Sequence, residues 1–167
     1  KNADKLVKAV AVGTGEFSDV EFVSLLPSAE TLVSESVDGQ LTSEENFGVN
    51  ITNVTTAEFV LLERANQTDE EITEEQLTLL KQNINAKEKL QLAAVIKVIV
   101  DNSDFNLPEG VETVLEFANN EEVTSDFIDN AVAKDANILS ETIEDIKNDE
   151  TLTETVNTIP TGSYVIG

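Results

Sequence analysis

Residues 34–45, SESVDGQLTSEE, carry the side chains whose types and spacing could bind a metal ion. Asp38 and Glu45 offer carboxylate oxygens, and the backbone carbonyl of Gln40 lies between them in the sequence. Oxygen atoms of this kind are the ligands that Ca²⁺ takes in proteins. Gly39 stands where the chain would turn sharply to bring them together. The spacing indicates a weak calcium site formed by Asp38, Gln40 and Glu45.

The second half of this segment resembles the calcium loop of EF-hand proteins. Gly39 and Gln40 correspond to the turn glycine and the carbonyl ligand of that loop, and Glu45 corresponds to its final bidentate glutamate. Ser34 and Ser36 stand where the family has Asp or Asn, so the resemblance implies fewer anionic ligands and a low affinity. The simpler alternative is a loop that ends in a helix cap. The sequence favours the cap and leaves the calcium site as the alternative.

Neighbouring carboxylates raise a second kind of chemistry. Pairs such as Glu70 with Glu71, or Glu121 with Glu122, could serve a hydrolase acting on polysaccharide, which uses two carboxyl groups. Seven Phe, one Tyr and no Trp offer few rings on which a sugar could stack. The chain has no Cys and no His, so thiolate nucleophiles and histidine bases are excluded. We therefore expect a non-enzymatic protein, with a carboxylate hydrolase as the alternative.

The charge of the chain restricts its partners and its surroundings. Ten basic and thirty-three acidic residues give a net charge of -23. Such a surface repels phosphate backbones and anionic lipid headgroups and attracts basic partners, so we expect no nucleic-acid binding. Strong acidity with many Asn, Thr and Ser predicts a protein at the extracellular or outer-membrane surface of a bacterium. No stretch is long and apolar enough to insert in a membrane.

The polar segments must be positioned by a buried central helix, predicted over about 86–101. Residues 92–100 are apolar except for Lys97, and at 100° per residue their side chains cover nearly the whole circumference of a helix. Neighbouring elements must therefore surround it. The fold class expected is mainly α, an irregular bundle of six to seven helices around this central helix, with a short N-terminal β hairpin.

Helix starts are marked by a Ser, Thr or Asn followed three residues later by Glu or Gln, a pattern that satisfies free amide groups of the first turn. The pattern occurs at Thr42, Thr55, Thr73 and Asn85. The elements expected in chain order are a hairpin over 5–12 and 19–25 and a short helix over 28–33. The seven helices of the bundle follow, over 43–47, 56–65, 74–83 and 86–101, with three more that begin at Pro108, near Val123 and after Asp135. Pro27 is expected to end the hairpin.

Three regions are expected: a β segment over 1–26 that could close a preceding sandwich module, a helical domain over 27–150, and an extended segment over 151–167 leading to a following module. With KAVAVGTGEF and SLLPSAETL near its start, this arrangement resembles helical modules of large secreted or outer-membrane-anchored bacterial multidomain proteins. The resemblance implies a structural, spacer or adhesion module. Its partners would be a protein or polysaccharide and neighbouring domains of the same chain, with a lipid anchor upstream.

Overall fold

The computed structural model describes residues 5–35, 51–66, 68 and 70–149. The calcium-site residues Asp38, Gln40 and Glu45 lie outside the described residues, as do the helix expected over 43–47 and the segment 151–167. The described elements are β1 Leu6–Val12, a short 3-10 turn Gly15–Phe17, β2 Glu21–Ser28, α1 Ala29–Glu35, α2 Asn53–Ala65, α3 Glu74–Asn83, α4 Ala86–Asp101, α5 Val114–Asn119, α6 Glu121–Lys134 and α7 Ile138–Asn148. The expected mainly α fold with an N-terminal antiparallel hairpin is confirmed.

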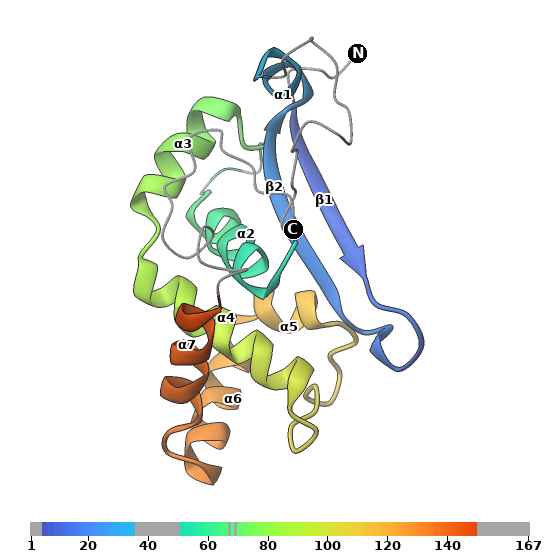
Figure 1. The fold of residues 1–167 in the computed structure, drawn as a ribbon, viewed down its shortest axis with the longest axis vertical. Coiled ribbons are helices and arrows are strands. Elements are labelled where there is room, and N and C mark those ends of the chain that lie inside the picture. Colours follow the sequence, from blue (N-terminus) through green and yellow to red (C-terminus); the bar gives the residue numbers. More distant parts are fainter. Residues whose placement is uncertain (1–4, 36–50, 67, 69, 150–167) are drawn as a thin grey trace.

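The centre of the core is α4, as its apolar run predicts. Four consecutive residues of this helix, Ala93 to Ile96, are fully buried, and helices α2 and α7 pack against it. In Figure 1, α4 runs diagonally through the molecule, with α2 beside it and α6 and α7 at the lower end. Within the described residues, every helix is too short or too polar to span a bilayer.

The helix caps follow the predicted pattern in part. Thr73 and Gln76 form the expected capping box of α3. The box expected at Thr55 is wrong, because α2 begins one turn earlier, at Asn53, with Thr52 as its N-cap. The hydroxyl of Thr55 accepts from the Thr52 N–H at 2.8 Å and completes that earlier box, so Thr55 is a member of the first turn and not its cap.

The helix expected to begin at Pro108 begins later, at Val114. Gly110 has a φ of +87°, a left-handed conformation that a helix cannot contain, so Pro108 opens only a turn. The cap of α5 is Thr113, whose hydroxyl accepts from the Glu116 N–H. Asn120 ends α5 and at the same time caps α6.

The helix expected after Asp135 is α7, but the expectation that Asp135 is its N-cap is wrong, because Asn137 holds that position. The helix begins at Ile138, and the Asp135 carboxylate accepts from the Asn137 N–H, so Asp135 caps the turn before the helix.

The second strand passes through Pro27 instead of ending there. Val7 pairs with Leu26 and Leu6 with Ser28, so Pro27 is the extra residue at a shift in the strand register. A residue at such a shift gives no N–H to the ladder, and a proline is tolerated there. The short helix that follows is Ala29–Glu35, slightly later than the expected 28–33.

Candidate functional site

The carboxylates singled out in the sequence do not converge in the structure. Glu71 forms an exposed ion pair with Lys5, with the Lys5 Nζ 2.7 Å from Glu71 Oε2. Glu121 and Glu122 are exposed in the first turn of α6. Within the described ranges, no group of three acidic side chains is arranged to hold a metal ion.

A cleft of about 690 Å³ lies where the end of α2, the elbow between α3 and α4, and the start of α6 meet. No sequence motif predicts it, because its walls come from three separate parts of the chain. The residues that line it are Leu61, Arg64, Ala65, Asn83, Ile84, Asn85, Glu88, Gln91, Leu92, Val95, Glu121, Thr124, Ser125 and Ile128.

The lining has an apolar floor and a polar rim. Leu92 and Val95 of α4 are buried, and Leu61 and Ile128 are half-buried beside them. The exposed members are mostly amide, hydroxyl and carboxylate side chains, namely Asn83, Asn85, Glu88, Glu121 and Ser125, together with Arg64 and Ala65. An apolar centre with a polar edge is the usual anatomy of a protein-binding surface.

Arg64 is held in place at the edge of this cleft. It lies in the last turn of α2, and its Nη2 donates to the backbone carbonyl of Ala118 at 2.9 Å. Ala118 lies near the C-terminal end of α5, where carbonyl groups lack helical partners and attract cations. A guanidinium carries five N–H donors, so the remaining donors of Arg64 can reach a ligand.

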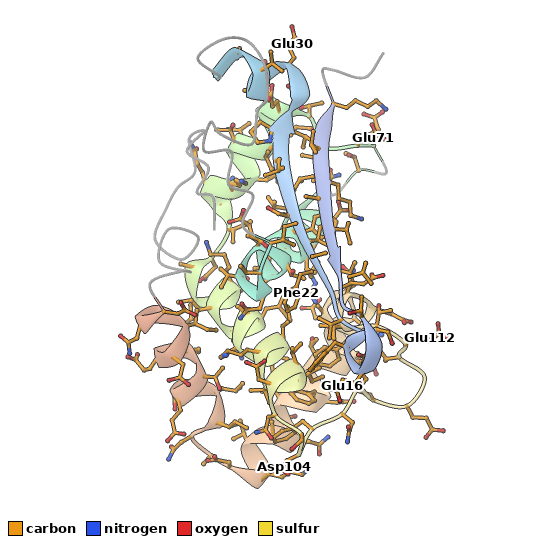
Figure 2. All side chains as sticks on the ribbon, turned by 45° about the vertical axis from the view of Figure 1, so that its right-hand side comes forward. Glu16, Phe22, Glu30, Glu71, Asp104 and Glu112 are labelled. Carbon is orange, nitrogen blue, oxygen red and sulfur yellow. The ribbon has the colours of Figure 1, made fainter. Side chains whose placement is uncertain are left out.

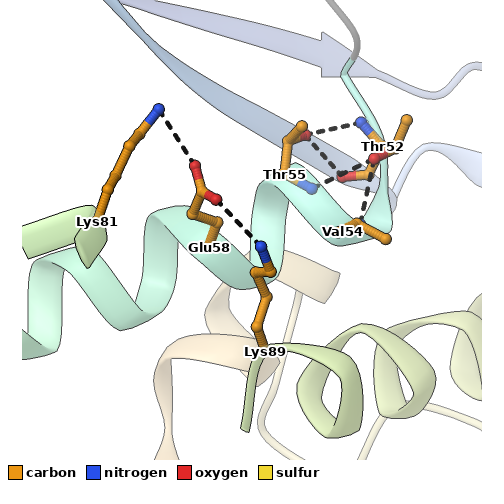
Figure 3. A network of polar contacts seen from close by, with 6 residues as sticks. All are labelled: Thr52, Val54, Thr55, Glu58, Lys81 and Lys89. Carbon is orange, nitrogen blue, oxygen red and sulfur yellow. Dashed lines mark hydrogen bonds and ion pairs between the residues drawn. The ribbon is translucent and has the colours of Figure 1, made fainter. Parts of the chain in front are cut away.

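The elbow that forms one wall is fixed by an ion network. Glu58 in α2 receives Lys81 from the last turn of α3, with 3.3 Å between Lys81 Nζ and Glu58 Oε1. It also receives Lys89 from α4, with 3.5 Å between Lys89 Nζ and Glu58 Oε2. Figure 3 shows the two lysines approaching the carboxylate from opposite sides. The two helices that flank the elbow are therefore tied to α2.

Two acidic residues of the rim stand at helix N-termini. Glu88 lies in the first turn of α4, behind the Asn85 cap, and Glu121 lies in the first turn of α6, behind the Asn120 cap. The unpaired N–H groups and the dipole at a helix N-terminus stabilise a carboxylate there. Both groups therefore add negative charge to the mouth of the cleft.

The pKa of the Glu74 carboxyl is lowered. The hydroxyl of Thr31 and then the backbone N–H and hydroxyl of Ser28 donate hydrogen bonds to it, which outweighs its burial. Glu74 lies at the start of α3, away from the cleft lining. A general acid of a polysaccharide hydrolase needs the opposite, a raised pKa.

Comparison with protein-family models, with curated proteins and with solved structures gave no match.

Proposed function

We propose that this chain is a non-enzymatic binding module of a secreted or outer-membrane-anchored bacterial protein, working as a spacer or adhesion unit. The cleft between α2, α4 and α6 would take a segment of a partner protein. The observation that carries the proposal is the apolar floor formed by Leu61, Leu92 and Ile128, above the fully buried Val95, inside a polar rim. The acidic composition, with a net charge of -23, supports an extracytoplasmic setting.

A protein segment fits the cleft better than a polysaccharide does. Among the described residues that line it there is no aromatic ring, so a sugar has no face on which to stack. An aliphatic floor instead suits the Leu, Ile or Val side chain of a peptide, which gains about 25 cal/mol for each Å² of apolar surface buried. The rim amides of Asn83 and Asn85 can bond to a peptide backbone.

The charges at the cleft indicate the chemistry of the segment. Glu88 and Glu121 favour Lys or Arg beside the apolar anchor, and the strongly negative protein as a whole attracts such a segment. Arg64 offers its remaining donors to a backbone carbonyl or to the carboxyl terminus of the segment. The partner is therefore a protein with an exposed basic and aliphatic stretch.

A displayed peptide library, panned on the purified chain, tests the proposal. We expect enriched peptides to contain an aliphatic residue flanked by Lys or Arg, and to shift the amide resonances of Asn83 and Asn85. Glu121→Lys should weaken their binding about tenfold, as expected for reversing one charge at a complementary rim. Glu122→Lys is the matched control, because Glu122 lies in the same turn and does not line the cleft.

Two results would overturn the proposal. One is equal binding of the enriched peptides to both variants, which would place them elsewhere on the surface. The other is release of reducing sugar from a polysaccharide by the purified chain, which would favour the carboxylate hydrolase.

A further inference from the structure

The hairpin has two outer edges, which differ in whether their backbone groups are hydrogen-bonded. The edge of β2, together with Asp19 just before it, is covered by groups from the helical part of the chain. Its bonds are Val114 N to Asp19 O at 2.8 Å, Val23 N to Thr56 Oγ1 at 2.9 Å, and Ser28 N to Glu74 Oε1 at 2.9 Å. These groups occupy the strand edge that would otherwise be open to another chain.

The other edge belongs to β1 and is open. Gly13 N donates to Val20 O, and Val23 points its N–H away from β1 to Thr56. Since antiparallel pairs alternate between bonded and non-bonded positions, Val10, opposite Val23, points its own N–H and C=O outward. Lys8 and Val12 do the same. In the part of the chain that the structure describes, these outward groups have no hydrogen-bond partner.

From Ala9 to Val12, beyond Lys8, the side chains along this edge do not protect it. Val10 and Val12 are 46% and 56% exposed, and they share one face of the hairpin. Strand edges are usually blunted by charges or proline, but the sequence has no charged residue and no proline between Lys8 and Glu16. In Figure 1, β1 lies on the outer side of the hairpin, with β2 between it and α2.

We propose that β1 pairs antiparallel with β1 of a second copy of this chain, so that the two hairpins form one four-stranded sheet. In the symmetric register, Val10 lies opposite Val10 of the second copy, and Lys8 lies opposite its Val12. The outward N–H and C=O groups of Val10 then bond to those of Val10 in the second copy, and the outward groups of Lys8 bond to those of its Val12. Their exposed valines form one apolar face, as in other strand additions.

The charges of the hairpin select a second copy in this orientation. The start of the hairpin carries Lys8 and Lys5, of which Lys5 is already paired with Glu71, and its tip is acidic, with Glu16, Asp19 and Glu21. Antiparallel pairing places the basic start of each hairpin beside the acidic tip of the other. Parallel pairing would place like charges together, which is unfavourable across strands.

The charge of the whole chain opposes this pairing at low salt. Two copies of -23 repel each other at long range, and the screening length falls from about 30 Å at 0.01 M to about 10 Å at 0.1 M salt. The neighbouring strands are much closer than either length. Raising salt therefore weakens the general repulsion more than the strand contacts, and the dimer should strengthen as salt rises.

Sedimentation velocity of the full chain at low and high NaCl tests the proposal. We expect a shift from monomer towards dimer as salt rises. Val10→Pro should abolish the shift, because it removes an outward N–H and leaves the ladder to β2 intact. Val12→Lys should weaken dimerisation about tenfold, because it places Lys opposite Lys8 of the second copy. Leu79→Lys is the matched control for Val12→Lys, because Leu79 is 59% exposed on α3 and both variants add one positive charge. It should dimerise like the parent chain.

A cross-linking experiment tests the same pairing without relying on Val10→Pro or Val12→Lys, either of which could disturb the fold. The chain has no cysteine, so Val10→Cys introduces a single thiol at the predicted symmetry axis. Mild oxidation should give a covalent dimer with Val10→Cys and not with Leu79→Cys. A chain that stays monomeric at high salt, or cross-linking that is equal at both positions, would overturn the proposal.

Discussion

The Nζ of Lys89 lies 3.5 Å from Oε2 of Glu58, and their side chains are only 8% and 14% exposed. The partners come from α4 and α2, the two helices with the largest shared interface in the helical part. Lys81 approaches the other oxygen of the same carboxylate. One Glu therefore forms ion pairs with two lysines at the junction of three helices, beside the elbow that lines the cleft.

Glu58→Gln should lower the free energy of unfolding by about 2 kcal/mol. Loss of one partner from a fully buried ion pair costs roughly 3–5 kcal/mol, and this network keeps some contact with solvent. The substitution leaves two ammonium groups close together without the carboxylate between them. Urea unfolding measures the change. Glu63→Gln, on the exposed side of the same helix, should stay within about 0.5 kcal/mol of the parent, and equal effects at both positions would contradict the role of the network.

Val95→Asp should unfold the chain at room temperature. Val95 is fully buried in α4, and an isolated carboxylate there costs several kcal/mol, a large fraction of the stability of a domain this size. Ile99→Asp, at the end of the same buried face, should act in the same direction. Circular dichroism with thermal melting gives the answer. The exposed control Gln82→Asp should melt close to the parent, and a Val95→Asp protein that does likewise would refute the central position of α4.

Stability should fall at pH values below the ordinary glutamate pKa, partly because of Glu74. Its pKa is lowered in the folded state, so its contribution is present above the ordinary glutamate value of about 4.3 and is lost as pH falls through the lower folded value. Glu74→Gln should remove part of the dependence of unfolding free energy on pH in that window. Glu75→Gln, exposed at the next position, serves as the comparison. Identical pH profiles for the parent and Glu74→Gln would contradict this.

Calcium should raise the melting temperature more than magnesium at equal ionic strength if the oxygens of Asp38, Gln40 and Glu45 converge on an ion. A ligand that binds only the folded state stabilises it by mass action. Glu45→Gln should remove the difference between the two cations. Equal effects of calcium and magnesium on the parent would leave residues 34–45 without a metal site.

Local signals in the sequence predict the elements well where capping and periodicity agree. Thr73 with Gln76 marks the start of α3, and the apolar run before Asp101 marks α4. The predicted start of a helix is wrong where another residue favours a backbone conformation that the helix cannot contain. Gly110, in a left-handed conformation, delays α5 from the expected start at Pro108 to Val114.

Long-range contacts could not be predicted from one sequence. Lys89 reads as part of a charged first turn, yet it is buried because Glu58, thirty-one positions earlier, receives it. The cleft has the same origin, since α2, α4 and α6 supply its walls. The side chains spread along the surface in Figure 2 include the acidic residues Glu16, Glu71 and Glu112, which shows how little the carboxylates of the sequence indicate a common site.

Three amide protons at the covered edge of β2 show whether the hairpin is packed on the helices. The amide protons of Val23, Ser28 and Val114 are protected by acceptors on the far side of the hairpin–helix junction. The Ala11 amide, by contrast, bonds within the hairpin. In hydrogen–deuterium exchange, separation of the hairpin from the helices would expose the first three amides together and spare the fourth. Their common exchange rate would measure how often the two parts of the chain come apart while each stays folded.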